Sequence, residues 1–169
     1  GHTLTVDSQG VRVERYWRLR YGAKLKIDET EALEELERRL TDATRKRVIA
    51  DVPLGAFLSG GIDSSLVVAM MASAAGRVRT FSIGFREREY SELDYARQVA
   101  VRFGTDHQEF TVTPDAAAIL PRLVWSYGEP FGDSSAIPTM YLAEVTRRSV
   151  TVALTGDSGD ENCAGYDRY

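Results

Sequence analysis

Cysteine and histidine are scarce in this chain, which has one Cys, Cys163, and two His among its 169 residues. A single thiol cannot form an internal disulfide, and so few ligands cannot supply the paired spacing of a structural zinc site. A reducing cytoplasm is therefore the expected compartment. Long apolar runs are also missing. The longest covers residues 66–76, about half of the ~20 residues that a membrane span requires, so no membrane association is expected.

An excess of basic charge is absent as well. The chain carries 21 Lys and Arg against 25 Asp and Glu, a formal net charge of -4. Nucleic-acid backbones are bound by clustered Lys and Arg, so nucleic acid is not an expected partner and small molecules are. No internal repeat or low-complexity tract is present. With 43% hydrophobic residues, the chain has the make-up of one globular domain with a real core.

The first 27 residues differ in pattern from the rest. Residues 3–6 and 11–17 alternate as two short strands around an Asp7-Ser8-Gln9-Gly10 turn, and residues 21–27 resemble a linker. An isolated hairpin is marginal in water, so this one either packs on the next domain or is the remnant of a preceding one. The predicted domains are therefore residues 1–27 and residues 28–169.

From Asp28 onward, helical and strand patterns alternate. Asp28 or Thr30 can cap the first helix, and strands are predicted at residues 54–58, 79–85, 108–112 and 150–154. Helices are predicted between them at residues 63–75, 91–103 and 137–148, with another opened by Thr113 and Pro114, in which Pro121 implies a kink or an early end. This alternation predicts a three-layer α/β fold, a parallel sheet flanked by helices, with ligands beyond the carboxyl ends of the strands.

The segment from Ser59 to Ser65, Ser-Gly-Gly-Ile-Asp-Ser-Ser, lies between a predicted strand end and a predicted helix start. Two adjacent glycines allow close backbone approach to an anion, and the turn amides with the Ser59, Ser64 and Ser65 hydroxyls supply donors. The Gly-Lys-Ser/Thr ending of a Walker loop is absent. A carboxylate, Asp63, in such a loop indicates a bridging Mg²⁺ shared with phosphates. The plainer alternative is a glycine turn with Asp63 as helix cap.

A second cluster directly follows the last apolar strand, and contains Asp157, Asp160 and Glu161 within five residues. Three neighbouring carboxylates repel one another unless they share a cation or a proton, which indicates a metal or catalytic role. The alternative is a solvated acidic loop.

These motifs carry a resemblance to a known family. Residues 59–64 resemble the pyrophosphate-binding loop of the N-type ATP pyrophosphatases, the PP-loop group with an adenine nucleotide alpha hydrolase-like fold. Residues 51–58, 80–85, 128–135 and 154–169, with Ile137-Pro138-Thr139, resemble the synthetase domain of glutamine-dependent asparagine synthetases. The match runs from about Gly1 to the last residue.

The resemblance implies a site that binds ATP and Mg²⁺. Leu58 and Ile83 would flank the adenine, and Asp63 and Asp160 would hold the metal. Asp157 is expected to assist ammonia attack, with Glu161 as a second catalytic acid. The remaining residues expected to contact the nucleotide are Ser59, Gly60, Gly61, Ser64, Ser65, Thr155 and Gly156.

The implied activity is that of an ATP-dependent amide ligase. It would convert the aspartate side-chain carboxylate to an acyl adenylate, release pyrophosphate, and transfer glutamine-derived ammonia to give asparagine. The resemblance further implies a truncated enzyme, inactive alone: residues 1–27 would be the remnant of a preceding glutaminase domain, and the distal helices with their adenylation lysine would be missing. It leaves a homodimer open.

Other functions remain open at this point. Many family members carry glycine where Ser158 and Ala164 stand and a Leu-Phe pair where Asn162 and Cys163 stand, so a related amidotransferase acting on a sugar or peptide acid is the main alternative. A PP-loop enzyme that modifies transfer RNA shares the loop but needs reactive cysteines and a basic face. A scaffolding relative without catalysis would not be expected to keep the acidic residues.

Overall fold

The structure is a computed structural model that describes residues 1–22, 24–86 and 91–166. The chain forms two compact units, Gly1–Glu35 and Leu36–Tyr169. Residue 23 of the predicted linker and residues 167–169 at the end of the family resemblance lie outside the described residues. None of the helices in the described ranges combines the length and the apolar character needed to cross a membrane.

The first unit contains the predicted hairpin, formed by β1 (His2–Asp7) and β2 (Gly10–Arg15). The strands are antiparallel, and Leu4 pairs with Val13. The Asp7 side chain closes the turn, accepting a hydrogen bond from the Gln9 amide at 2.8 Å. Alternation along paired strands places Leu4, Val6, Val11 and Val13 on one face, where all four are exposed.

Helix α1 (Glu29–Arg47) begins at a reciprocal cap. The Glu31 amide donates to Asp28 Oδ1 at 2.9 Å, and the Asp28 amide donates to Glu31 Oε2 at 3.3 Å. This pair satisfies two of the amides that a helix start leaves without partners. Of the two caps considered from the sequence, Asp28 is therefore the one that is used.

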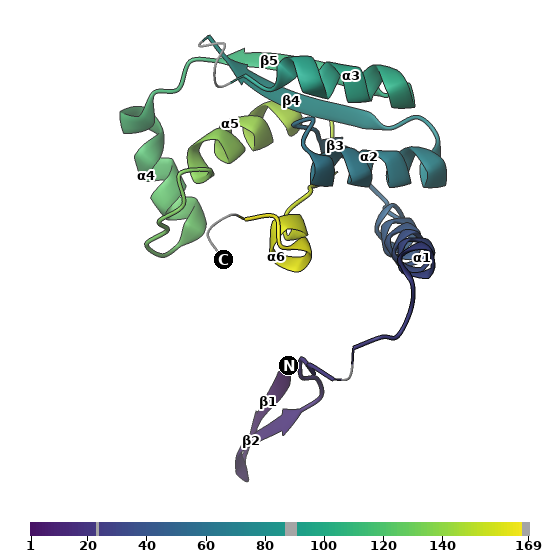
Figure 1. Ribbon diagram of the computed structural model, residues 1–169. Coiled ribbons are helices and arrows are strands. Elements are labelled where there is room, and N and C mark those ends of the chain that lie inside the picture. The colour runs from purple at the N-terminus through teal and green to yellow at the C-terminus, as the bar shows by residue number, and fades with distance from the viewer. Residues whose placement is uncertain (23, 87–90, 167–169) are drawn as a thin grey trace. The chain divides into compact units, whose positions relative to one another are not determined.

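The second unit contains a four-stranded sheet in the order β5-β4-β3-β6, and every neighbouring pair is parallel. Its strands are β3 (Leu54–Phe57), β4 (Arg79–Phe85), β5 (Asp106–Val112) and β6 (Val152–Leu154). Its helices after α1 are α2 (Ile62–Ala75), α3 (Leu93–Phe103), α4 (Ala116–Tyr127), α5 (Ala136–Thr146) and α6 (Gly159–Cys163). Figure 1 shows these helices around the sheet. The predicted α/β fold with a parallel sheet is confirmed.

The strand order defines a switch in the direction of winding. The chain runs outward from β3 through β4 to β5, and then returns across the sheet to place β6 on the other side of β3. Because parallel crossovers are right-handed, α2 and α3 cover one face and the α4–α5 connection covers the other. The winding therefore reverses between β3 and β6, the position at which open α/β sheets bind ligands.

The main core lies between the sheet, α2 and α3. Its buried residues come from β3 and the position after it, from the position before β4, and from the two helices: Ala56, Leu58, Val78, Val68, Met71, Ala96 and Ala100. On the opposite face, Gly55 makes room for the fully buried ring of Phe81, because a Cβ at position 55 would lie 2.7 Å from that ring. The sheet is thus packed tightly at the base of β3.

Two local features differ from the sequence prediction. The cap of α4 is Asp115, which accepts a hydrogen bond from the Ala118 amide at 3.0 Å, and the helix continues past Pro121 to Tyr127. The short helix α6 occupies part of the acidic segment that the sequence analysis treated as a loop.

Candidate functional site

A cleft of about 750 Å³ opens at the carboxyl ends of β3, β4 and β6. This volume is within the usual range for small-molecule sites. Because β3 and β6 are hydrogen-bonded neighbours, the loops that follow them meet at this point. Ten of the predicted site residues line the cleft: Leu58, Ser59, Gly61, Asp63, Ser64, Ile83, Thr155, Gly156, Asp157 and Asp160.

The loop after β3 is held by its own hydroxyl groups. Ser59 Oγ and Ser64 Oγ lie 2.9 Å apart, and Ser59 Oγ also accepts the Gly61 amide at 3.1 Å. Gly61, the cap residue of α2, has no side chain with which to cap the helix. The first amides of α2 are therefore left for a ligand, and the positive end of the helix dipole favours an anion there.

Gly60 has a structural reason to be glycine. Its φ is +89°, and a Cβ at this position would lie 2.5 Å from backbone atoms of Tyr95 and Ala96 in α3. Such contacts are too short for any side chain. Gly60 is not among the cleft-lining residues, so its absent side chain allows the loop to pack on α3.

Ser65 also lies away from the cleft lining. Its hydroxyl is buried and has no hydrogen-bond partner among the described residues. Ser65 was predicted to be a phosphate donor, whereas the structure places its hydroxyl within the protein.

The loop after β6 rests on the first turn of α2. A Cβ at Gly156 would lie 2.6 Å from the Ser64 amide nitrogen, and one at Gly159 would overlap the carboxyl group of Asp63. Only glycine allows the two loops to approach this closely. These contacts bring Asp63 against the residue that precedes Asp160.

The acidic residues of the second loop have different surroundings. Thr155 Oγ1 donates to Asp157 Oδ2 at 2.8 Å, which fixes Asp157 at the cleft. Glu161 accepts a hydrogen bond from the Tyr166 hydroxyl at 3.1 Å and does not line the cleft. Of the two predicted catalytic acids, only Asp157 therefore lines it.

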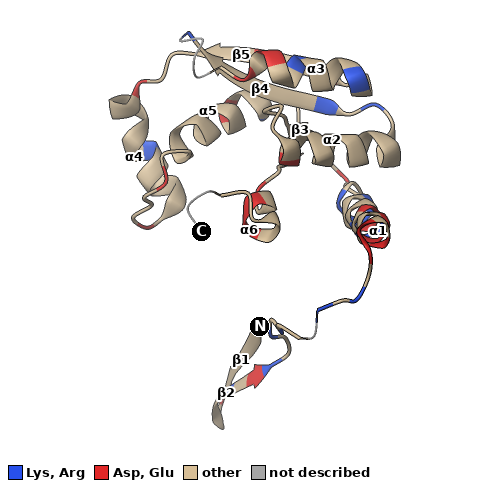
Figure 2. Ribbon diagram, viewed as in Figure 1, with Lys and Arg blue, Asp and Glu red and all other residues tan. Residues whose placement is uncertain are grey.

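The charged residues in the described lining of the cleft are all acidic. Asp63, Glu92, Asp157 and Asp160 contribute carboxylates, and no Lys or Arg is found among the lining residues that the structure describes. Figure 2 shows the acidic positions at the start of α2 and on α6. A polyphosphate could bind beside these groups only with backbone donors and a neutralising cation.

The donors available for that cation are oxygens, which suit Mg²⁺. No group of three or more His, Cys, Asp or Glu side chains in the described part of the chain is arranged to hold a metal by itself. Mg²⁺ commonly binds through one or two carboxylates together with substrate phosphates. Asp63 and Asp160, which come from the two loops, fit this mode of binding.

Several cleft residues were not assigned a role from the sequence. Ser82, Phe85 and Glu92 line the β4 side, and Ser135, Pro138, Thr139 and Leu142 line the α5 side. The sequence did point to three of the residues on the α5 side, because residues 135 and 137–139 belong to segments that carry the family resemblance. Ser82 and Phe85 also belong to such a segment, residues 80–85, whereas Glu92 carried no signal of this kind.

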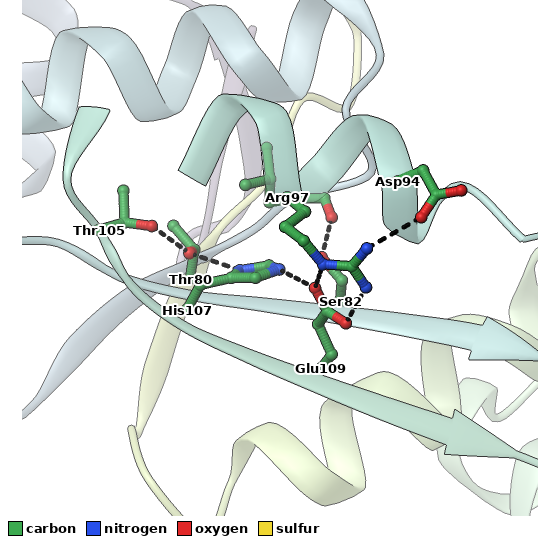
Figure 3. A network of polar contacts seen from close by, with 8 residues as sticks. Thr80, Ser82, Asp94, Arg97, Thr105, His107 and Glu109 are labelled. Atoms are coloured by element: carbon green, nitrogen blue, oxygen red, sulfur yellow. Dashed lines mark hydrogen bonds and ion pairs between the residues drawn. The ribbon is translucent and has the colours of Figure 1, made fainter. Parts of the chain in front are cut away.

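A second polar cluster lies outside the cleft, between α3, β4 and β5 (Figure 3). His107 Nδ1 lies 2.8 Å from Thr80 Oγ1, and His107 Nε2 lies 3.4 Å from Glu109 Oε1. Arg97 binds the Glu109 carboxylate through two hydrogen bonds of 3.0 and 2.8 Å. Burial lowers the pKa of His107 below its ordinary value; Glu109 opposes this effect, and Arg97 adds to it. His107 thus belongs to a polar network that lies outside the cleft lining.

Comparison with known proteins bears on the identity of the chain. The family model for asparagine synthase matches residues 35–169, which include both loops and all of the sheet. The chain belongs to the asparagine synthase family. A putative glutamine-hydrolysing asparagine synthetase 2 of Methanocaldococcus jannaschii is 41% identical over 164 residues, covering 95% of this chain and 32% of the relative.

A second member of the asparagine synthase family gives a similar match. The glutamine-hydrolysing asparagine synthetase 1 of Bacillus subtilis is 32% identical over 171 residues, covering all of this chain and 27% of the relative. The chain thus spans about a third or less of these two relatives.

The fold of this family member is shared with a solved structure. The glutamine-dependent NAD+ synthetase of Acinetobacter baumannii, determined in complex with adenosine diphosphate, superposes with a TM-score of 0.56 and 24% identity. The match covers 86% of this chain and 29% of that one. At this identity the likeness establishes a common architecture.

Two departures from the asparagine synthase family pattern coincide with unusual backbone. Ser158 has φ 73° and Ala164 has φ 56°, and they are the only non-glycine residues with positive φ in the described ranges. These are two positions at which glycine was expected from the resemblance. Cys163, which lies between these two residues, is exposed and lines the cleft. One of the positions that depart from the family pattern is therefore part of the site.

Proposed function

We propose that this chain is the nucleotide-binding part of an ATP-dependent amide ligase that converts aspartate to asparagine. The observation that carries the proposal is the meeting of two glycine loops at the switch point of the sheet, in an acidic cleft beside the free amides of α2. Membership of the asparagine synthase family supports the same reaction.

The proposed reaction has two steps. An aspartate side-chain oxygen attacks the α-phosphorus of ATP, forming an acyl adenylate while pyrophosphate leaves. Ammonia derived from glutamine then attacks the acyl carbon, a proton is lost, and AMP leaves with its bond electrons. Both steps depend mainly on placing the reactants and stabilising the charge that develops.

The proposal gives each loop a role. The amides at the start of α2, with Ser59 and Gly61, hold the phosphates; Thr155 and Gly156 contact the nucleotide from β6. Ile83 and the backbone of Leu58 flank the adenine, because the Leu58 side chain is 1% exposed and belongs to the core. Asp157, fixed by Thr155, accepts the proton that ammonia loses.

Asp63 and Asp160 are the proposed Mg²⁺ ligands, with the phosphate oxygens and water completing the shell. When bound, Mg²⁺ would neutralise negative charge on the pyrophosphate as it leaves. The two aspartates also keep the cleft unfavourable for a bare polyphosphate, because neither has a Lys or Arg beside it in the described lining.

We further propose that residues 1–27 are the end of a preceding glutaminase domain. The apolar face formed by Leu4, Val6, Val11 and Val13 is exposed in this unit, and a two-stranded hairpin needs a further partner for stability. A glutaminase sheet would provide that partner, and the glutaminase itself would provide the ammonia.

The identity of the acid is the part of the proposal that needs a direct test. Cys163 lines the cleft at a position that departs from the family pattern, which keeps an amidotransferase for a sugar or peptide acid as the second candidate. Pyrophosphate release by the full-length protein should be measured with aspartate and with other acids. Release that requires aspartate supports asparagine formation; release only with another acid supports the second candidate, and ATP turnover with no acid would reject both.

A further inference from the structure

Ser82 is a polar residue inside the sheet that has no assigned role. It lies on β4, is 3% exposed, and is one of the residues at the edge of the cleft. Its hydroxyl donates to the backbone carbonyl of Leu58, at the end of the neighbouring strand (Figure 3). Leu58 is the last residue before the glycine loop.

The peptide unit that joins Leu58 to Ser59 is held at both ends. Its carbonyl accepts the Ser82 hydroxyl, and its amide, on Ser59, donates to Ser64 Oγ at 3.2 Å. The Leu58 amide is also fixed, because it donates to the Phe81 carbonyl at 2.9 Å. A peptide plane with both groups bonded has little freedom to rotate.

The orientation of this peptide is passed on to the loop. Ser64 Oγ contacts Ser59 Oγ at 2.9 Å, and Ser59 Oγ accepts the Gly61 amide at 3.1 Å. Ser82, Ser64 and Ser59 therefore form a continuous chain of hydrogen bonds from β4 to the cap of α2. Ser64 is 9% exposed and its hydroxyl is occupied within this chain.

We propose that Ser82 is a positioning residue that fixes the phosphate-binding loop through the Leu58–Ser59 peptide. The inference rests on the proposed function, since it takes the loop to be the phosphate site. Removing the hydroxyl leaves the buried Leu58 carbonyl without this donor, so the peptide gains freedom to rotate. A loop that must be ordered on binding holds its anion more weakly than one that is already ordered.

The test uses Ser82→Ala, Ser82→Thr and a matched control, Thr80→Val, in the full-length protein. Thr80 lies two positions earlier on the same face of β4 and is fully buried, and its hydroxyl contacts Thr105 and His107 at 2.8 Å. Thr80→Val therefore removes a buried hydroxyl from the same strand without touching the loop. Affinity for pyrophosphate with Mg²⁺ is measured by calorimetry, alongside the thermal midpoint.

We expect Ser82→Ala to weaken pyrophosphate binding about tenfold, the loss typical of one hydrogen bond in a binding site. Ser82→Thr keeps the donor and should retain most of the affinity. Thr80→Val should lower the thermal midpoint while binding pyrophosphate like the unmodified protein. Equal losses of affinity in Ser82→Ala and Thr80→Val would overturn the proposal, because they would indicate general destabilisation.

Amide hydrogen exchange provides a readout that needs no ligand. In the ligand-free protein, Ser82→Ala should speed hydrogen exchange at the Ser59 and Gly61 amides, while the exchange rates of the β3 amides should not change. Unchanged exchange at both amides would overturn the positioning role even if affinity fell. A protein that binds neither pyrophosphate nor ATP would refute the proposed function, while the exchange rates would still decide whether Ser82 orders the loop.

Discussion

Gly159 lies directly against the carboxyl group of Asp63, so that a Cβ at position 159 would overlap it. Asp63 lies in the first turn of α2 and Gly159 begins α6. Their contact brings Asp63 close to the residue that precedes Asp160, the other proposed metal ligand. A side chain at position 159 would therefore require the Asp63 carboxylate to move.

Gly159→Ala should displace the Asp63 carboxylate and lower the affinity for Mg-ATP about tenfold, since metal sites tolerate little movement of a ligand. Gly132→Ala is the matched control, because a Cβ at position 132 would meet no atom within 4 Å. Calorimetric titration of both variants with Mg-ATP makes the comparison. Wild-type affinity in Gly159→Ala would show that Mg-ATP binding does not depend on the space that Gly159 leaves for the Asp63 carboxylate.

Asp63→Asn and Asp160→Asn should each reduce adenylation by several orders of magnitude, with a much smaller loss of ATP affinity. The reason is that the cation chiefly stabilises charge that develops on the leaving pyrophosphate. The measurement is pyrophosphate release at saturating ATP and Mg²⁺. Asp94→Asn serves as the control, because this carboxylate is exposed and pairs with Arg97 at 2.9 Å, outside the cleft lining. A near-normal rate in either cleft variant would identify its carboxylate as structural.

Ala164→Gly should raise the free energy of unfolding by about 1 kcal/mol, because glycine adopts the left-handed region at little cost whereas alanine is strained there. The same change at Ser158 should act in the same direction, since both have positive φ. Ala143→Gly, at an exposed position inside α5, should instead lower stability by about 1 kcal/mol. Chemical denaturation of the three variants checks these signs, and a loss of stability in Ala164→Gly would contradict the backbone argument.

His107 should make stability depend on pH in the acid range. Its pKa is lowered in the folded state, mainly by burial, so the unfolded chain takes up a proton here more readily. This contribution to stability is fully present above the ordinary pKa of ~6.5 and is lost as pH falls towards the lowered folded value, with a slope of at most ~1.4 kcal/mol per pH unit. Denaturation curves at several pH values should show a smaller slope for His107→Gln; an identical slope would exclude His107 as the cause.

Much of the fold could be predicted because the local pattern and the final packing agree. The run at residues 54–58 is apolar and is followed by a glycine turn, and β3 covers its first four residues with a buried centre. The predicted end of the helix at residues 91–103 is also confirmed, because α3 ends at Phe103 and Gly104 follows it with φ 60°. In these segments the local preference of the residues agrees with the conformation that the fold requires, so the sequence alone predicts the element.

The parts that could not be predicted depend on contacts between distant segments. Gly60 was predicted to contact the nucleotide, and nothing in the local sequence indicated that a Cβ at this position would meet the backbone of α3. Ser82 gave no sign that its hydroxyl reaches the adjacent strand, because strand pairing is not encoded locally. Pro121 was expected to kink its helix or to end it early, and the early end is not found, because α4 continues to Tyr127. Tertiary packing can override a local preference of this size.

The pairing of β6 with β3 has a consequence for the order in which the site is assembled during folding. Leu54 pairs with Val152, almost a hundred positions later in the chain, whereas β3, β4 and β5 are joined by short local crossovers. Contacts between distant positions form slowly because a large loop must first be closed. The second glycine loop follows β6. A nascent chain that has formed only β3, β4 and β5 therefore has one of the two loops that line the cleft. Nucleotide bound to the complete cleft would then stabilise the last strand to dock, and release of that strand would be the first step by which the site is lost.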